Sequence, residues 1–140
     1  MNMPMTIDRT GSQFIVLIFY DYVMKIPRGD DTDLDTICKH QQELALQFPE
    51  ILPAYNYNTY IFQLRAKGTR LDELEKHCSQ ELWECIWEKR NALVTKLRDA
   101  GYNGYDINTS NTFYDTCTGE LSVVDVLYSP VQVHEVTVSE

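Results

Sequence analysis

Short strand-like and helical hydrophobic patterns follow one another along the first half of the chain. β-Branched and aromatic residues gather in runs bounded by turn-forming residues, which is typical of strands. Between these runs lies a segment of helical period that Asp31, Thr32 or Asp33 can cap and that Pro49 ends. No regular element is predicted for residues 1–12. The predicted elements are strands over residues 13–20, 22–26, 51–57 and 58–64 and a helix over about residues 33–48.

The second half opens with Gly68, which suggests a hinge, and then carries the longest helical pattern, from Leu71 to about Ala100. This pattern fits one helix, or two helices that meet near residues 77–80. Gly101 is a natural C-terminal stop. The remaining pattern predicts a polar loop and a hairpin, with the loop at residues 103–111 and strands at residues 112–114 and 121–126. The last alternating stretch, residues 131–138, fits either an edge strand or a tail.

The length and composition favour one domain with one core. The chain has 140 residues, and 44% of them are hydrophobic. We therefore expect a single domain over residues 1–140, with an N-terminal part at residues 12–66 and a C-terminal part at residues 67–140. The predicted fold class is α+β, in which a small antiparallel sheet with one helix precedes a helical part that ends in the hairpin.

The charge balance disfavours polyanionic partners. Lys and Arg together number 12 and Asp and Glu 21, which gives a net charge of −9. Such a surface repels nucleic acid and anionic lipid, but a local Lys or Mg²⁺ can still hold a nucleotide. The apolar run at residues 14–20 is too short to span a bilayer, and no cleavage site of a secreted protein follows it. We therefore expect a cytoplasmic protein with free thiols, no membrane contact and no nucleic-acid partner.

Oxygen-bearing side chains gather in the polar loop and at the end of the hairpin. Asp106 and Asn111 lie five positions apart in the loop, and Asp125 lies at the end of the second hairpin strand. Phosphoryl transfer to a hydroxyl needs a carboxylate that orients the attacking group and oxygen ligands that hold Mg²⁺. Asp and Asn also favour ordinary turns, and this spacing occurs by chance, so the motif alone leaves a plain loop as the alternative.

The order of these residues resembles the protein-kinase-like superfamily, whose Asp-x-x-x-x-Asn catalytic loop precedes a hairpin that ends in a metal-binding Asp. The resemblance implies that Asp106 is the catalytic base and that Asn111 and Asp125 bind the metal. It also implies ATP and Mg²⁺ as cofactors. The fold it implies is a minimal kinase-like one, with a small N-terminal lobe and a reduced C-terminal lobe.

The resemblance extends toward the N-terminus. Val23-Met24-Lys25-Ile26 is similar to the family's strand with a phosphate-holding Lys, so Lys25 is the implied nucleotide contact. Glu43, in the following helix, stands where the partner of this Lys is found in the family. The alternative for Lys25 is an outward position on an alternating strand, and the alternative for Glu43 is plain solvent exposure.

The chain also departs from the family pattern. Gly104 and Tyr105 stand where the family usually has a His and its following residue, and Val126 and Leu127 follow Asp125 in place of Phe-Gly. No Gly-rich phosphate loop precedes Lys25. Short bacteriophage kinase-like proteins share several of these irregularities.

Two functions therefore compete. The first is an ATP- and Mg²⁺-dependent phosphotransferase with an unknown acceptor. The second is a non-catalytic kinase-like binding module, or an acidic inhibitor of a protein partner, and the resemblance to bacteriophage proteins implies a phage-encoded one. The aromatic residues Trp83 and Trp87 of the long helix fit either a core position or a surface for a protein partner or a second copy of the chain.

Overall fold

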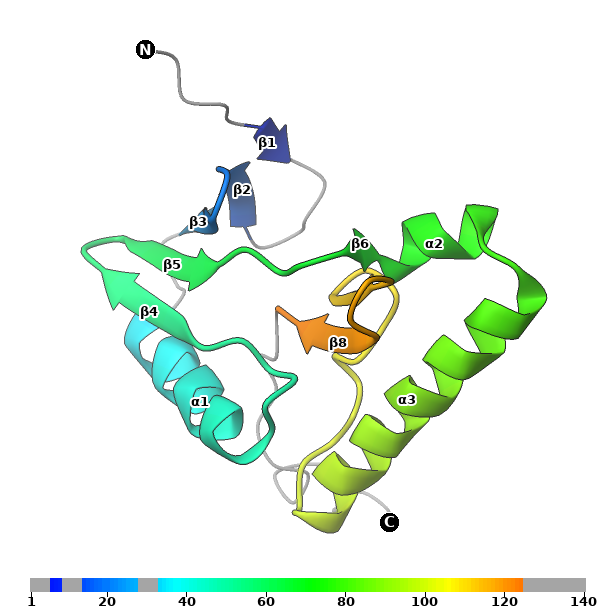
Figure 1. The fold of residues 1–140 in the computed structure, drawn as a ribbon. Helices are drawn as coiled ribbons and strands as arrows, with labels where there is room; N and C mark the ends of the chain where they lie inside the picture. Colours follow the sequence, from blue (N-terminus) through cyan, green and yellow to red (C-terminus); the bar gives the residue numbers. More distant parts are fainter. Residues whose placement is uncertain (1–5, 9–13, 28–32, 125–140) are drawn as a thin grey trace, which may run out of the picture. The chain divides into compact units, whose positions relative to one another are not determined.

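The computed structural model of the chain describes residues 6–8, 14–27 and 33–124 (Figure 1). The chain divides into two compact units, Met1–Ala66 and Lys67–Glu140. The first unit has a five-stranded sheet and the second a three-stranded one. The fold class is α+β, as the sequence predicts. None of the helices in the described part of the chain combines the length and apolar character needed to cross a membrane.

The sheet of the first unit is antiparallel, with the strand order β1-β2-β3-β5-β4. The strands are β1 (Thr6–Asp8), β2 (Phe14–Ile18), β3 (Tyr22–Pro27), β4 (Ala54–Tyr57) and β5 (Tyr60–Leu64). β3 is the central strand, and its Lys25 pairs with Val16 on one side and with Ile61 on the other. Directly paired residues share a face of the sheet, so these three side chains lie on one face.

The helix α1 (Leu34–Gln47) contacts β4 and β5 (Figure 1). Asp33 caps it, because its carboxylate accepts hydrogen bonds from the Thr36 backbone N–H at 3.2 Å and from the Thr36 hydroxyl at 2.7 Å. These bonds hold the pKa of Asp33 below its ordinary value. The buried residues of α1 recur every three positions on one face and are Cys38, Gln41 and Leu44.

The second unit joins a hairpin to two helices. Its strands are β6 (Thr69–Arg70), β7 (Thr112–Asp115) and β8 (Glu120–Val123), and its helices are α2 (Leu71–His77) and α3 (Gln80–Asp99). The sheet order is β6-β7-β8. One core cluster joins the helices to the hairpin and contains Leu71, Ile86, Tyr114 and Leu121, with the partly buried Leu74, Leu82 and Trp83 packed against it.

The long helical pattern is broken into two helices, which was one of the two alternatives from the sequence. Cys78 adopts an extended conformation with φ −85° and ψ 166° and ends α2. Ser79 then caps α3, because its hydroxyl accepts the Leu82 N–H at 3.1 Å.

α3 ends at the predicted glycine. Gly101 has φ +94°, and its N–H donates to the Arg98 carbonyl oxygen at 3.0 Å. The Tyr102 N–H donates to the Leu97 carbonyl oxygen at 2.9 Å, which completes a Schellman motif. This turn sends the chain from α3 directly into the loop with the candidate site residues.

The structure corrects several predicted boundaries. The sequence pattern predicts neither β1 nor β6, which are short and are defined by pairing with β2 and β7. β4 begins at Ala54, since the preceding Pro53 has no N–H to donate. The β4–β5 turn lies at Asn58–Thr59, where Asn58 has φ 61°. β8 ends at Val123, and the strand-like stretch at residues 131–138 lies outside the described residues.

Gly68 provides a test of the junction into the second unit. It has φ +91°, and an added Cβ would collide with the Tyr114 backbone carbonyl of β7. Gly101 has a similar φ of +94° but open space around an added Cβ. We expect Gly101→Ala to cost about 1–2 kcal/mol of backbone strain and Gly68→Ala to cost clearly more. Urea unfolding of the two variants checks this, and equal destabilisation would contradict it.

The four cysteines are free thiols and differ in accessibility. Burial raises the pKa of the Cys38 thiol, whereas Cys85 and Cys117 are exposed. The thiolate is the reactive form, so we expect Cys38 to react with an aromatic disulfide reagent at least about tenfold more slowly than the two exposed thiols. Labelling followed by site-resolved mass spectrometry measures the rates. Urea should remove the difference, and equal rates in the native chain would contradict the placement of Cys38.

Candidate functional site

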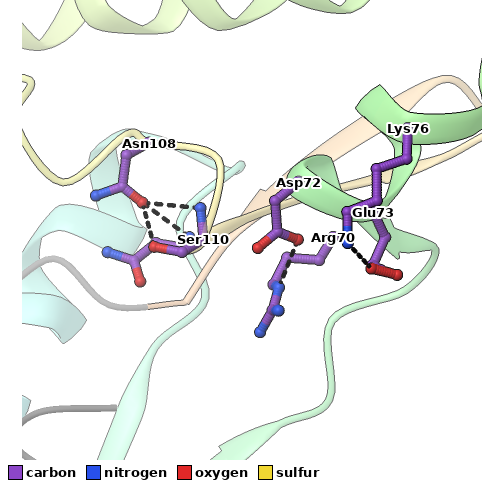
Figure 2. Close-up of polar contacts among 7 residues, drawn as sticks. Arg70, Asp72, Glu73, Lys76, Asn108 and Ser110 are labelled. Atoms are coloured by element: carbon purple, nitrogen blue, oxygen red, sulfur yellow. Dashed lines mark hydrogen bonds and ion pairs between the residues drawn. The ribbon is translucent and has the colours of Figure 1, made fainter. Parts of the chain in front are cut away.

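The loop between α3 and β7 is bent by the side chain of Asn108. Its Oδ1 accepts hydrogen bonds from the Ser110 N–H at 3.0 Å, from the Ser110 hydroxyl at 2.8 Å and from the Asn111 N–H at 3.0 Å (Figure 2). An Asn that binds the backbone two and three residues later is a common way to form a tight turn. The turn reverses the chain between Asp106 and Asn111.

The structure brings Asp106 and Asn111 together. The Asn111 Nδ2 donates to the Asp106 carbonyl oxygen at 3.3 Å. Asp106 is buried, with 8% of its surface exposed, and Asn111 is half-buried. The loop therefore closes on the two residues that the sequence singles out. Their catalytic and metal-binding roles remain predictions.

The loop is also attached to the rest of its unit at three points. The Arg90 Nε donates to the Ile107 carbonyl oxygen at 2.8 Å, and the Asp72 N–H donates to the Thr109 carbonyl oxygen at 3.1 Å. The Val124 N–H donates to the Asn111 carbonyl oxygen at 3.0 Å. α3, the start of α2 and the end of the hairpin thus each hold one part of the loop.

Asp125, the predicted second metal ligand, lies outside the described residues. Val124 precedes it directly, and the bond from Val124 to Asn111 brings the end of the described hairpin to the predicted metal-binding Asn. Among the described residues, no group of three or more His, Cys, Asp or Glu side chains is arranged to hold a metal ion. Because Asn111 donates through Nδ2, the atom it can offer to a cation is Oδ1, a hard oxygen of the kind that Mg²⁺ prefers.

Charged pairs on helix α2 and at its N-cap are partly exposed. Arg70 binds Asp72 at 2.8 Å, and Lys76 binds Glu73 at 3.1 Å (Figure 2). Exposed pairs of this kind add only about 0–1 kcal/mol each. They shape the surface of α2 without determining the position of the loop.

In the first unit, Lys25 is buried in a network of amides. Its side chain is 4% exposed, and its Nζ donates to Gln63 Oε1 at 2.8 Å. Gln63 Nε2 and Gln41 Nε2 each donate to the Leu52 carbonyl oxygen at 3.0 Å. The alternative of an outward position for Lys25 is therefore wrong.

Glu43 is the predicted partner of Lys25. It is exposed on α1, on the side away from the buried Cys38, Gln41 and Leu44. Gln41 is the α1 side chain that joins the buried amides, through Leu52. Glu43 is therefore exposed whereas Lys25 is buried, and their pairing stays a prediction.

The contacts of two polar residues, Gln63 and Arg90, were not predicted from the sequence. Gln63 interrupts the apolar strand β5, and an amide in such a position is a usable signal of a buried polar contact. Arg90 lies seven residues after Trp83 and three residues after Trp87. This spacing places all three on one face of α3. The carbonyl that Arg90 binds could not be read from the helix pattern.

The fold is similar to solved kinase structures. No protein-family model matches the sequence, and no curated protein sequence matches it. The chain is similar to WbdD in a co-crystal structure with a kinase inhibitor, with a TM-score of 0.56 and 16% identity, over 89% of this chain and 32% of that chain. It is also similar to the kinase PK-1 of Cydia pomonella granulovirus, with a TM-score of 0.56 and 18% identity, over 84% of this chain and 47% of that chain.

The chain therefore has a protein-kinase-like fold, and the resemblance predicted from the sequence is confirmed at the level of the fold. It spans 32% and 47% of the lengths of these two solved chains. At 16% and 18% identity the similarity establishes the fold. The chemistry must be argued from the residues of this chain.

The buried amides around Lys25 give a testable energetic difference. Gln41 and Gln63 both donate to the Leu52 carbonyl, but Gln63 also accepts from the Lys25 ammonium. A hydrogen bond to a charged group contributes about 1.5–3 kcal/mol. We expect Gln63→Leu to lower the free energy of unfolding by about that much more than Gln41→Leu does. Urea unfolding at constant pH measures the difference, and equal losses would show that Lys25 does not depend on Gln63.

Proposed function

We propose that the chain is a minimal kinase-like phosphotransferase that uses ATP with Mg²⁺. The observation that carries the proposal is the closure of the loop, in which Asn111 bonds to the Asp106 backbone and Val124 bonds to Asn111. This closure supports a site where Asp106, Asn111 and Asp125 converge, as phosphoryl transfer requires. The kinase-like fold supports the same reading.

Each residue has a separate role in this proposal. The Asp106 carboxylate orients the acceptor hydroxyl and accepts its proton as the oxygen attacks the γ-phosphorus and the bond to the β,γ-bridging oxygen breaks. Asn111, through Oδ1, and Asp125 would hold Mg²⁺. When bound, the ion supplies positive charge against the phosphate oxygens. Lys25 contacts the phosphates, and its burial among amides fixes the position of its ammonium group.

A second candidate is a kinase-like binding module without catalysis. The exposure of Glu43 favours it, because the pair with Lys25 that the resemblance implies would join an exposed carboxylate to a buried ammonium group. The net charge of −9 fits an acidic inhibitor of a basic protein partner. The two candidates differ in whether Mg²⁺-ATP binds.

Calorimetric titration of the purified chain with ATP, with and without Mg²⁺, tests the proposal. We expect measurable binding that weakens by about tenfold or more without Mg²⁺, which corresponds to the loss of a charge-assisted contact. Asp125→Asn should lose the Mg²⁺-dependent part, and Lys25→Met should weaken binding in both conditions. If ATP does not bind either with or without Mg²⁺, the result would contradict the phosphotransferase and favour the inhibitor.

Turnover separates the role of Asp106 from nucleotide binding. We expect slow ATP hydrolysis by the wild-type chain. Asp106→Asn should keep ATP binding but lower the hydrolysis rate by about 10²–10⁴-fold, the usual contribution of a general base. Asp99→Asn is the matched control, because it makes the same chemical change at an exposed position of α3. An equal loss of rate in both variants would contradict the role of Asp106.

A further inference from the structure

The segment just before Asp106 is shaped by short-range hydrogen bonds. Gly104 has no side chain, and Tyr105 is 64% exposed. The bonds formed here are short-range, from the Ile107 N–H to the Gly104 carbonyl oxygen at 3.1 Å and from the Tyr105 N–H to Asn103 Oδ1 at 3.1 Å. These bonds shape the loop locally, and contacts with α3 connect it to the rest of the unit.

α3 contacts the loop at two places one helical turn apart. Arg90 Nε donates to the Ile107 carbonyl oxygen at 2.8 Å, and Ile107 is fully buried. Four residues later, Val94 packs so close to Gly104 that an added Cβ would lie 2.7 Å from Val94 Cγ1. Residues four apart lie on one face of a helix, so Arg90 and Val94 present a single surface to both ends of the segment around Asp106.

The Arg90 guanidinium is itself held in place. It lies over the Trp87 ring at 4.8 Å from the centroid, and its Nη1 donates to Asn91 Oδ1 at 2.9 Å. Trp87 stacks on Trp83, with 5.5 Å between ring centroids, and Trp83 packs against the core cluster. Burial, and then the charge of Arg98, lower the pKa of Arg90, yet an arginine remains protonated in proteins. Its bond to the Ile107 carbonyl is therefore charge-assisted.

We infer that Arg90 is a positioning residue, which fixes the backbone of the Asp106 loop from α3 by its bond to the Ile107 carbonyl oxygen. The inference rests on the proposed function for the meaning of Asp106 as a base, while the bond itself is independent of that function. Arg90 reaches the residue next to Asp106 and contacts no reacting atom in this arrangement. A displacement of about 1 Å at a reacting group can lower a rate by about 10²-fold, so a fixed loop matters for turnover.

Amide hydrogen exchange followed by nuclear magnetic resonance tests the bond without any need for activity. Arg90→Met removes the donor, and Arg90→Lys keeps the charge but loses the planar Nε–H donor. We expect the Ile107 and Asn111 amides to exchange about tenfold to a hundredfold faster in both variants, the range given by the loss of one charge-assisted bond. Amides in the middle of α3 should keep their rates. Unchanged exchange in the loop would overturn the inference.

Lys89→Met is the matched control. Lys89 is the neighbouring cation on α3 and also donates to a backbone carbonyl, that of Gly119 at 2.8 Å, but this carbonyl lies in the β7–β8 turn. The control should leave the exchange of Ile107 and Asn111 unchanged. Equal acceleration by Lys89→Met would mean that any loss from this part of α3 loosens the loop, and it would overturn the specific role of Arg90.

The wild-type chain offers a second measurement in case a variant does not fold. The Nε–H of Arg90 should exchange with water at least about tenfold more slowly than the Nε–H of the exposed Arg98, because only the former is bonded to a buried carbonyl. Equal exchange of the two guanidinium groups would overturn the inference.

Kinetics then distinguish a positioning role from a merely structural one. Arg90→Lys should lower kcat for ATP hydrolysis by about tenfold to a hundredfold while KM for ATP changes by less than about threefold. Suppose that the wild-type chain hydrolyses ATP. If Arg90→Lys then accelerates loop exchange but leaves kcat unchanged, the positioning role is overturned. If the wild-type chain hydrolyses no ATP, the proposed function fails, and the exchange data alone still decide whether Arg90 holds the loop.

Discussion

In the second unit, the bond from Asn111 Nδ2 to the Asp106 carbonyl oxygen, at 3.3 Å, is the contact that joins the two candidate site residues. It closes the loop that leaves α3, and β7 begins at Thr112, the residue after Asn111. β6 and β8 pair with the two sides of β7, so the strand that follows the loop is the central strand of its sheet.

The first unit depends on a different constraint, the burial of a charge on its central strand. An ammonium group transferred away from water is costly unless hydrogen-bond acceptors surround it. Gln63 provides one acceptor, and its amide nitrogen is held in turn by the Leu52 carbonyl. The amide orientation is thus set from both ends, which keeps Lys25 at a defined position on β3. A flexible surface lysine would lose far more side-chain freedom on binding a ligand.

The parts of the fold that the sequence predicts are those with local causes. The cap at Asp33 and the stop at Gly101 each involve contacts within a few residues, so the pattern alone locates α1 and the end of α3. β6 was missed, because its two residues form a strand only by pairing with Tyr114 and Phe113 far along the chain. The site divides in the same way. The spacing of Asp106 and Asn111 is a local motif, whereas the contacts of Gln63 and Arg90 join segments that are distant in sequence.

The two tryptophans of α3 have different roles in the structure. From the sequence, Trp83 and Trp87 fit either the core or a surface for a partner. In the structure, Trp83 packs against the core cluster, and Trp87 lies between Trp83 and the Arg90 guanidinium. Because the stack ends on the residue that bonds to the loop, the indole rings support the loop from inside the same unit. The aromatic residues of α3 therefore have a structural use within the second unit.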